Sequence, residues 1–84
     1  MVYEVVLTDK SKKQLRKLEL NQRERVISVL ERIRIRPYSH IKKLVGNPYF
    51  RVRVGDLRII IDIKDEKLII LVLEIGNRRN IQEK

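Results

Sequence analysis

The chain has 84 residues and no cysteine, and its twenty lysine and arginine side chains against eleven acidic ones give a formal net charge of +9. This length predicts a single domain, residues 1–84, built on one small core. The absence of cysteine excludes a disulfide framework and a thiolate zinc site, and one histidine is too few for an imidazole-rich site, so we expect no metal and no cofactor. The charge favours a polyanionic partner, and the composition favours a reducing, cytoplasmic setting.

Residues 2–7 have the pattern of a strand rather than of a signal peptide. No apolar run approaches the roughly 20 residues of a membrane span, so we expect no contact with a membrane. Thr8 is a candidate N-cap for a first, strongly basic helix, with Leu15 and Leu18 on its inner stripe.

A second helix is predicted to follow directly. Asn21 with Glu24 three residues later resembles a capping box. The helix should stop before Pro37, because the residue preceding a proline disfavours the helical conformation. Its inner stripe at helical spacing is Val26, Ile27, Leu30 and Ile33.

Residues 49–61 alternate polar and apolar side chains on both sides of Gly55-Asp56. Glycine in the first loop position fits a type II′ turn, which predicts a hairpin with a two-residue loop. That loop pairs Val54 with Leu57, Arg53 with Arg58, and Val52 with Ile59.

The last two strands are predicted to turn around residues 64–67, which pairs Ile63 with Leu68 and Arg58 with Leu73. The resulting order β-α-α-β-β-β predicts an α+β fold, an antiparallel sheet with a helical hairpin packed on one face. The expected core face of the sheet consists of Phe50, Val52, Val54, Leu57, Ile59, Ile61, Ile63, Leu68, Ile70 and Val72.

The opposite face of the predicted sheet carries Arg51, Arg53 and Arg58. Like charges directly opposite one another destabilise a sheet, and cross-strand terms run to about 0.2–1 kcal/mol, so an anionic ligand would turn a cost into a gain. Guanidinium groups suit this role because they bind phosphate through forked hydrogen bonds and keep their proton. Apolar residues on the same face predict a partner that covers it: Ile60, Ile69, Leu71 and Leu73.

Four other polar residues allow more than one interpretation. Tyr49 shares the parity of the arginines and fits either a stacking platform for an unpaired base or an edge aromatic packed on the sheet. His40 lies in the loop between helix and strand, which favours a solvated side chain over an acid–base catalyst. Asp62 and Glu74 fit members of local ion pairs better than catalytic carboxylates.

Three segments together closely resemble the RelE/ParE toxin superfamily, nearest to its RelE-like branch. They are the K-L-x-G lead-in and basic strand of residues 43–53, the hairpin of residues 55–59, and the terminal G-x-R of residues 74–79. The resemblance covers nearly the whole chain and implies a RelE-like fold of the microbial-ribonuclease type. It also implies the toxin of a type II toxin–antitoxin system, a ribosome-dependent endoribonuclease that cuts messenger RNA in the A site without a metal and so inhibits translation.

The resemblance further implies the roles of individual residues. In this family the RNA 2′-hydroxyl attacks the adjacent phosphodiester and leaves a 5′-hydroxyl on the downstream fragment. Arg51 and Arg53 match two strand lysines and would orient the backbone, Arg58 would stabilise charge at the phosphorane, and Arg78 would neutralise the leaving group. The expected RNA-binding residues are Arg79, Tyr49 and Lys43. Arginine at position 51 is a poor proton acceptor at neutral pH, so these residues leave the general base unassigned.

The implied partners are messenger RNA on the ribosome and a RelB-like cognate antitoxin, whose partly acidic and partly apolar segment would order on binding. Two alternatives stay open. The first is a ParE-like toxin that acts on DNA gyrase without nuclease activity. The second is a catalytically weak RNA-binding module, held by phosphate contacts and strongly dependent on salt.

Overall fold

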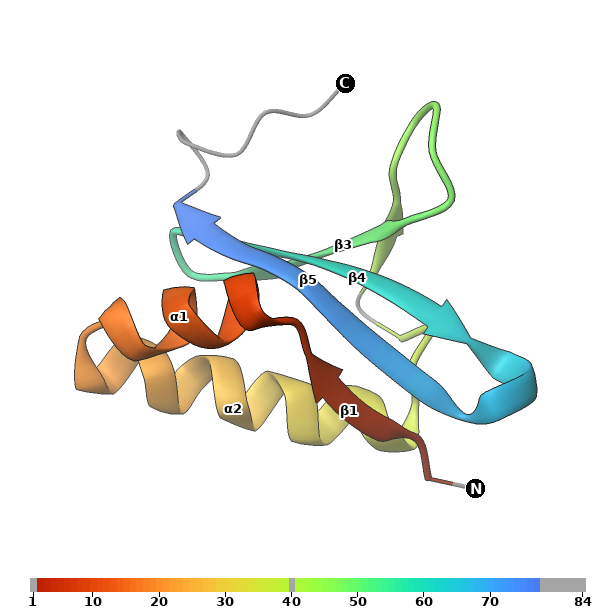
Figure 1. Ribbon diagram of the computed structural model, residues 1–84, viewed down its shortest axis with the longest axis horizontal. Coiled ribbons are helices and arrows are strands. Elements are labelled where there is room, and N and C mark those ends of the chain that lie inside the picture. The colour runs from red at the N-terminus through yellow and green to blue at the C-terminus, as the bar shows by residue number, and fades with distance from the viewer. Residues whose placement is uncertain (1, 40, 78–84) are drawn as a thin grey trace.

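The computed structural model describes residues 2–39 and 41–77. In these residues two helices pack on one face of a five-stranded sheet (Figure 1), which confirms the predicted α+β fold. The elements in chain order are β1 (Glu4–Leu7), α1 (Asp9–Lys17), α2 (Leu20–Ile35), β2 (Lys42–Lys43), β3 (Phe50–Val54), β4 (Leu57–Lys64), a 3₁₀ turn (Asp65–Lys67) and β5 (Ile69–Asn77).

The strands lie in the order β1-β5-β4-β3-β2. The pairs β3–β4 and β4–β5 are antiparallel, as predicted, and β2 is antiparallel to β3. The sheet is nevertheless mixed, which corrects the prediction of an antiparallel sheet, because β1 runs parallel to β5 at the edge. The two-residue strand β2 was not predicted. In Figure 1 both helices lie beneath the sheet, and no other helix or strand of the described residues covers its opposite face, which we call the open face.

The first helix begins as predicted. The backbone N–H of Ser11 donates to Thr8 Oγ1 at 3.1 Å, which satisfies one of the amides that a helix start leaves without an intrahelical partner. Helix α2 ends at Ile35, two residues before Pro37, which is also as predicted.

The predicted capping box of α2 is wrong. The helix begins at Leu20 with Glu19 as its N-cap residue, and no side chain caps it. Asn21 lies inside the first turn, where its Oδ1 accepts from the backbone N–H of Gln22 at 2.8 Å. Because α1 ends at Lys17, only Leu18 and Glu19 separate the two helices.

Apolar side chains from α2 and three strands form the core. The buried members are Val26, Leu30, Ile33, Val52, Val54, Leu57, Ile59, Ile61, Ile70, Val72 and Ile75. Leu15 and Leu18 pack against this cluster from the end of α1, as expected. Ile27 was predicted on the inner stripe but is 46% exposed, because it lies on the flank of α2 that faces away from the sheet.

The Gly55-Asp56 hairpin has the predicted register, with Val54 opposite Leu57 and Arg53 opposite Arg58. Gly55 has φ +58°, the left-handed value that the first loop position of a type II′ turn requires.

The predicted register of the last hairpin is wrong. Ile63 lies opposite Ile70 rather than Leu68, and Lys64 lies opposite Ile69. The 3₁₀ turn uses Asp65–Lys67, and Leu68 follows with φ +54°, so Leu68 belongs to the loop and not to the core face. The sequence does not indicate that Leu68 lies in the loop, because leucine rarely adopts a left-handed conformation and here continues an apolar run.

A β-bulge in β5 shifts the register again. Ile60 lies opposite Glu74 while Ile61 lies opposite Val72, so Leu73 is the extra residue. The parity of β5 therefore reverses, which places Ile75 in the core at 2% exposure. It also brings Gly76, not Leu73, opposite Arg58, so the prediction for that pair is corrected.

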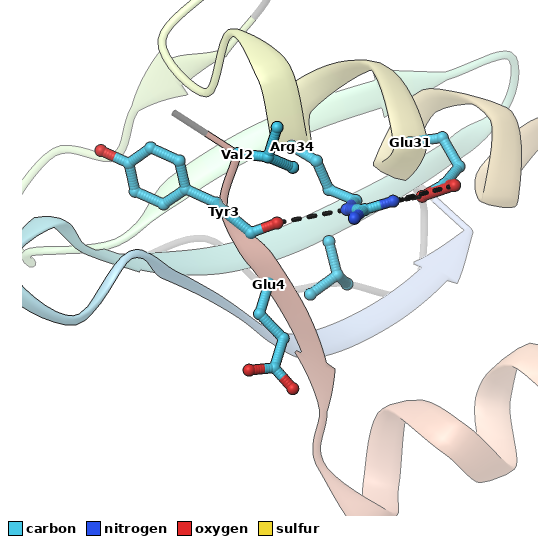
Figure 2. A pocket seen from close by; sticks show the side chains of 6 residues that line it. Val2, Tyr3, Glu4, Glu31 and Arg34 are labelled. Carbon is cyan, nitrogen blue, oxygen red and sulfur yellow. Dashed lines mark hydrogen bonds and ion pairs between the residues drawn. The ribbon is translucent and has the colours of Figure 1, made fainter.

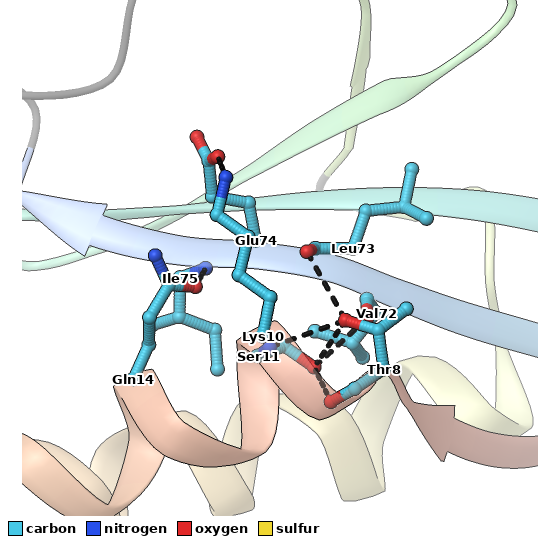
Figure 3. Close-up of polar contacts among 8 residues, drawn as sticks. All are labelled: Thr8, Lys10, Ser11, Gln14, Val72, Leu73, Glu74 and Ile75. Carbon is cyan, nitrogen blue, oxygen red and sulfur yellow. Dashed lines mark hydrogen bonds and ion pairs between the residues drawn. The ribbon is translucent and has the colours of Figure 1, made fainter.

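Helix α1 takes over the edge of β5 where β1 ends, as Figure 3 shows. Ser11 Oγ donates to the Val72 carbonyl at 2.9 Å, Thr8 Oγ1 donates to the Leu73 carbonyl at 3.3 Å, and the Ile75 N–H donates to Gln14 Oε1 at 2.7 Å. Side chains of α1 thus bond backbone groups of β5 that would otherwise present an open sheet edge.

Two tyrosines bind the Asp65 carboxylate and join β1, the loop after α2 and the last hairpin. The hydroxyl of Tyr3 donates to Oδ1 at 2.7 Å and that of Tyr38 donates to Oδ2 at 2.6 Å. These hydrogen bonds lower the pKa of Asp65 and raise the pKa of Tyr38 to about 12.

Candidate nucleic-acid interface

Four of the cationic side chains on the open face lie next to one another along β3. Arg53 lies opposite Arg58, and Arg51 lies opposite Lys42, so two like-charged pairs adjoin along β3. The Arg53–Arg58 pair is the first beyond the turn-closing pair of a two-residue hairpin, the type with Cα atoms only roughly 4.5 Å apart and side chains closest together. The sheet therefore holds these charges where their repulsion is largest.

The two arginines of the hairpin pair differ in environment. Arg53 is exposed, whereas Arg58, in the central strand β4, is only 8% exposed. Its neighbour on β5 is Gly76, which has no side chain to place on this face. A guanidinium withdrawn from water is costly, and it is also held in place in advance of binding, which suits electrostatic stabilisation of a reacting group.

A hollow of about 250 Å³ opens beside this row of charges at the β2–β3 edge. Its lining residues are Ile41, Lys42, Arg51 and Arg53. Three of the four are cationic, which gives the hollow the chemistry of an anion site.

The two adjacent lysines of β2 point to opposite faces. Lys43, which the sequence predicted as an RNA-binding residue, lies opposite Phe50, and its ammonium is 5.6 Å from the centre of the Phe50 ring. Lys42 is the one that lies beside Arg51. The structure does not bring Lys43 to the arginines, so we leave it out of the site and include Lys42. The sequence signal for Lys42 was only its position next to Lys43, and a side-chain period of two requires the register to choose between them.

Tyr49 directly precedes β3. Its carbonyl accepts from the Leu44 N–H at 3.0 Å, and its own N–H donates to Asn47 Oδ1 at 2.9 Å. The first of these bonds continues the β2–β3 pairing by one residue, which keeps Tyr49 in line with Arg51 on the open face. Its predicted roles as a stacking platform or an edge aromatic both remain predictions.

The remaining candidates lie outside the described residues. Arg78, Arg79 and His40 belong to this group. The last described residue, Asn77, lies opposite Leu57 beside the Gly55-Asp56 turn, so β5 leads to the arginine pair before the chain reaches Arg78.

Asp62 and Glu74, on the open face, form ion pairs with lysines, as predicted for them. Asp62 Oδ2 lies 3.1 Å from Lys64 Nζ, and this hydrogen bond raises the pKa of Lys64. Glu74 pairs with Lys10 of α1 (Figure 3).

The open face is less apolar at its surface than predicted. Ile60 is 8% exposed, because Arg51 and Glu74 flank it and long polar side chains cover apolar neighbours with their stems. The other three, Ile69, Leu71 and Leu73, are half-buried and lie along β5. The large apolar side chains exposed in the described residues lie elsewhere: Val2, Leu20, Ile27, Ile35, Tyr38 and Val45.

A larger hollow, of about 460 Å³, lies between β1 and α2 (Figure 2). Its lining residues are Val2, Tyr3, Glu4, Val5, Glu31 and Arg34. Arg34 is bound there by Glu31 Oε2 at 2.7 Å and by the Tyr3 carbonyl at 3.2 Å. Glu31 thus already neutralises the Arg34 cation, so its larger volume alone does not make this hollow the anion site.

No helix within residues 2–39 and 41–77 is long and apolar enough to cross a membrane.

Comparison with known families identifies the chain. The family model described as the ParE toxin of the type II toxin–antitoxin system parDE matches residues 5–82. The chain therefore belongs to the ParE toxin family. A search of curated proteins found no match.

Solved structures with the same fold include the following three. The RelBE2 toxin–antitoxin complex of Mycobacterium tuberculosis matches with a TM-score of 0.85 and 23% identity over 93% of this chain and 100% of that one. The archaeal RelE–RelB complex of Pyrococcus horikoshii matches with a TM-score of 0.84 and 23% identity, over 96% of this chain and 100% of that one. A double arginine-to-alanine mutant of Escherichia coli RelE, in complex with a peptide of the antitoxin RelB, matches with a TM-score of 0.80 and 25% identity. The match covers 92% of this chain and 84% of that one.

These comparisons define the class. The protein is a toxin of a type II toxin–antitoxin system with the RelE/ParE fold. The family model is that of ParE and the similar structures are those of RelE, so family membership alone does not define the reaction.

Proposed function

We propose that the protein is a metal-independent endoribonuclease that cuts messenger RNA in the ribosomal A site and so inhibits translation in the cytoplasm. The observation that carries the proposal is the row of cations on the open face, with Arg58 withdrawn from water beside Arg53. A sheet that served only to fold would not place like charges opposite each other, whereas a phosphodiester would be gripped by both.

The reaction needs charge stabilisation more than it needs a covalent partner from the protein. The 2′-oxygen of one nucleotide attacks the adjacent phosphorus as it loses its proton, and the bond from phosphorus to the 5′-oxygen breaks. The products are a 2′,3′-cyclic phosphate and a 5′-hydroxyl. Negative charge builds on the phosphorane oxygens and on the leaving oxygen between these events, and fixed cations lower the barrier most at those atoms.

Each arginine has a proposed part in this reaction. Arg58, the least exposed, stabilises the phosphorane; Arg51 and Arg53 hold the backbone on the open face. Arg78 and Arg79 follow the end of β5, which lies beside the hairpin, and we assign Arg78 to the leaving oxygen. Arginine keeps its proton at neutral pH, so the 2′-hydroxyl proton goes to another acceptor.

The proposed regulator is a RelB-like antitoxin. Similar structures are described as complexes with RelB, and the positive open face favours a partly acidic segment of such a partner. The half-buried Leu71 and Leu73 on β5 would take its apolar side chains.

Purified protein added to ribosomes programmed with a defined messenger RNA provides the test. Primer extension should show new 5′ ends within the A-site codon, and messenger RNA free of ribosomes should be cut far less. Gyrase supercoiling of plasmid DNA in a parallel reaction should be unchanged.

A ParE-like action on DNA gyrase is the second candidate, because the matching family model is that of ParE. Intact messenger RNA together with inhibited supercoiling would establish that candidate in place of the nuclease. RNA binding without scission in either assay would instead favour the weak RNA-binding module.

A further inference from the structure

We propose that the hollow at the β2–β3 edge is a second phosphate subsite, which holds the RNA strand one nucleotide away from the phosphate at Arg58, and that Lys42 is its principal unassigned contact. The inference rests on the proposed function, because it names a further part of the same RNA path. It adds a residue that only the strand register brings to the open face.

The hollow is distinct from the position of Arg58. Its lining residues are Ile41, Lys42, Arg51 and Arg53, and Arg58 is not among them. At about 250 Å³ it is below the roughly 300–1,000 Å³ of ordinary small-molecule sites, a size that suits one phosphate with part of its sugar. The cations would take the phosphate, and Ile41 supplies an apolar wall for the sugar.

The spacing of the like-charged pairs matches successive phosphates. The Lys42–Arg51 and Arg53–Arg58 pairs are two residues apart along β3, which is about 6.6 Å, and are displaced by one strand spacing of about 4.8 Å. Their centres are therefore roughly 8 Å apart, within the range that long lysine and arginine side chains can adjust to neighbouring phosphates. A single strand that crosses β3 obliquely would bind one pair with each phosphate.

The chemistry of the hollow favours RNA over an acidic peptide. The apolar neighbours of the open face, among them Leu71 and Leu73, lie on β5, two strands away from β3 in the sheet order. A partly apolar peptide gains most at that end, whereas the β2–β3 end offers three cations and one apolar side chain. A ligand with a charge on every unit fits the β2–β3 end better.

The two lysines of β2 provide a matched pair of variants. Lys42→Met and Lys43→Met remove the same charge from adjacent, exposed positions, but only the first removes it from the open face. In single-turnover cleavage on programmed ribosomes, Lys42→Met should raise the half-saturating toxin concentration about tenfold and leave the maximal rate within about twofold of wild type. Lys43→Met should change neither, and Lys42→Arg should restore binding. Circular dichroism checks that all variants are folded.

A chemical substitution in the RNA locates the contact. Messenger RNAs with one neutral methylphosphonate at each position around the cleavage site should include one, next to the cut phosphate, that weakens the wild type about tenfold but does not weaken Lys42→Met further. The dependence of log affinity on log salt should be shallower for Lys42→Met by about 0.7, the share of one phosphate contact on a single strand.

The outcomes separate this inference from the proposed function. If wild type and Lys43→Met cut the messenger RNA and Lys42→Met matches them in half-saturation and salt dependence, the subsite is wrong and the nuclease stands. If Lys42→Met cuts messenger RNA like wild type but is no longer inhibited by an acidic antitoxin peptide, the hollow is an antitoxin site and the inference is overturned. If the wild type cuts no messenger RNA, both proposals fail.

Discussion

The two faces of the sheet follow opposite rules. On the helix-covered face, Val52, Ile59 and Ile75 lie side by side on β3, β4 and β5, each at 2% exposure or less. On the open face, the neighbouring pair along the same two strands, β3 and β4, is Arg53 with Arg58. One face is built from neighbours that stabilise each other, and the other from neighbours that repel.

This difference separates what the chain needs for folding from what it needs for binding. The apolar face and the helices that cover it provide the stability, because burial of apolar surface is the main favourable contribution to folding. That stability offsets the repulsion between the cations that the open face holds at fixed spacing. Variants of the two faces should therefore affect different measurements.

The largest expected effect is on the helix-covered face. Ile59→Ala should lower the free energy of unfolding by about 2–5 kcal/mol, a large part of the roughly 5–15 kcal/mol typical of small domains, because it leaves a cavity at a fully buried position. Urea unfolding followed by circular dichroism measures this loss. Ile27→Ala, on the exposed flank of α2, is the control and should change the same quantity by less than about 0.5 kcal/mol. Equal losses for the two variants would show that the core is not where the structure places it.

Smaller changes in stability, of opposite sign to each other, are expected for variants of the two lysines of β2. Lys42→Thr should stabilise the fold by about 0.2–1 kcal/mol at low salt, because it relieves the repulsion with Arg51 across the strands. The gain should shrink as salt screens the charges. Lys43→Thr should instead destabilise the fold by about 0.5 kcal/mol, since it removes the contact between the ammonium and the Phe50 ring. The same sign of change for both lysines would contradict the assignment of faces.

The smallest effect concerns Asp65 and depends on pH. Its folded-state pKa is depressed below the ordinary value of 3.8 by the tyrosine hydrogen bonds, so its contribution to stability is present above that value and is lost as the pH falls through the folded pKa. The unfolding temperature of Asp65→Asn should accordingly lie slightly below that of wild type at pH 6–8, and the two should converge in acid. A gap that widens in acid would reverse the sign of this linkage.

The sequence predicts the fold class and the arginine hairpin because each rests on a strong local signal. Glycine at position 55 allows the left-handed conformation of the turn, and the strict alternation from Arg51 to Arg58 leaves one register. The apolar run of β5 has no such signal. Residues 69–73 are apolar at both parities, so neither the four-residue loop ending at Leu68 nor the bulge at Leu73 leaves a mark in the pattern.

The candidate site was predictable to the same extent as the strands that carry it. Arg51, Arg53 and Arg58 share a face because the hairpin register was correct. Lys42 was missed and Lys43 chosen, because a two-residue strand is too short for periodicity to determine which of two adjacent lysines faces the arginines. The prediction for the start of α2 failed for a different reason: Asn21 lies inside the first turn, where its side chain accepts from the N–H of its neighbour Gln22 instead of capping the helix.

The central claim is that the open face carries out phosphodiester cleavage and contributes little to folding. Primer extension on programmed ribosomes, paired with urea unfolding of the same samples, tests it for wild type and Arg58→Ala. We expect Arg58→Ala to stay folded and to cut about 10²–10³-fold more slowly, the size expected when one preorganised charge-stabilising donor is removed. A folded Arg58→Ala protein that cuts the A-site codon as fast as wild type would contradict the account.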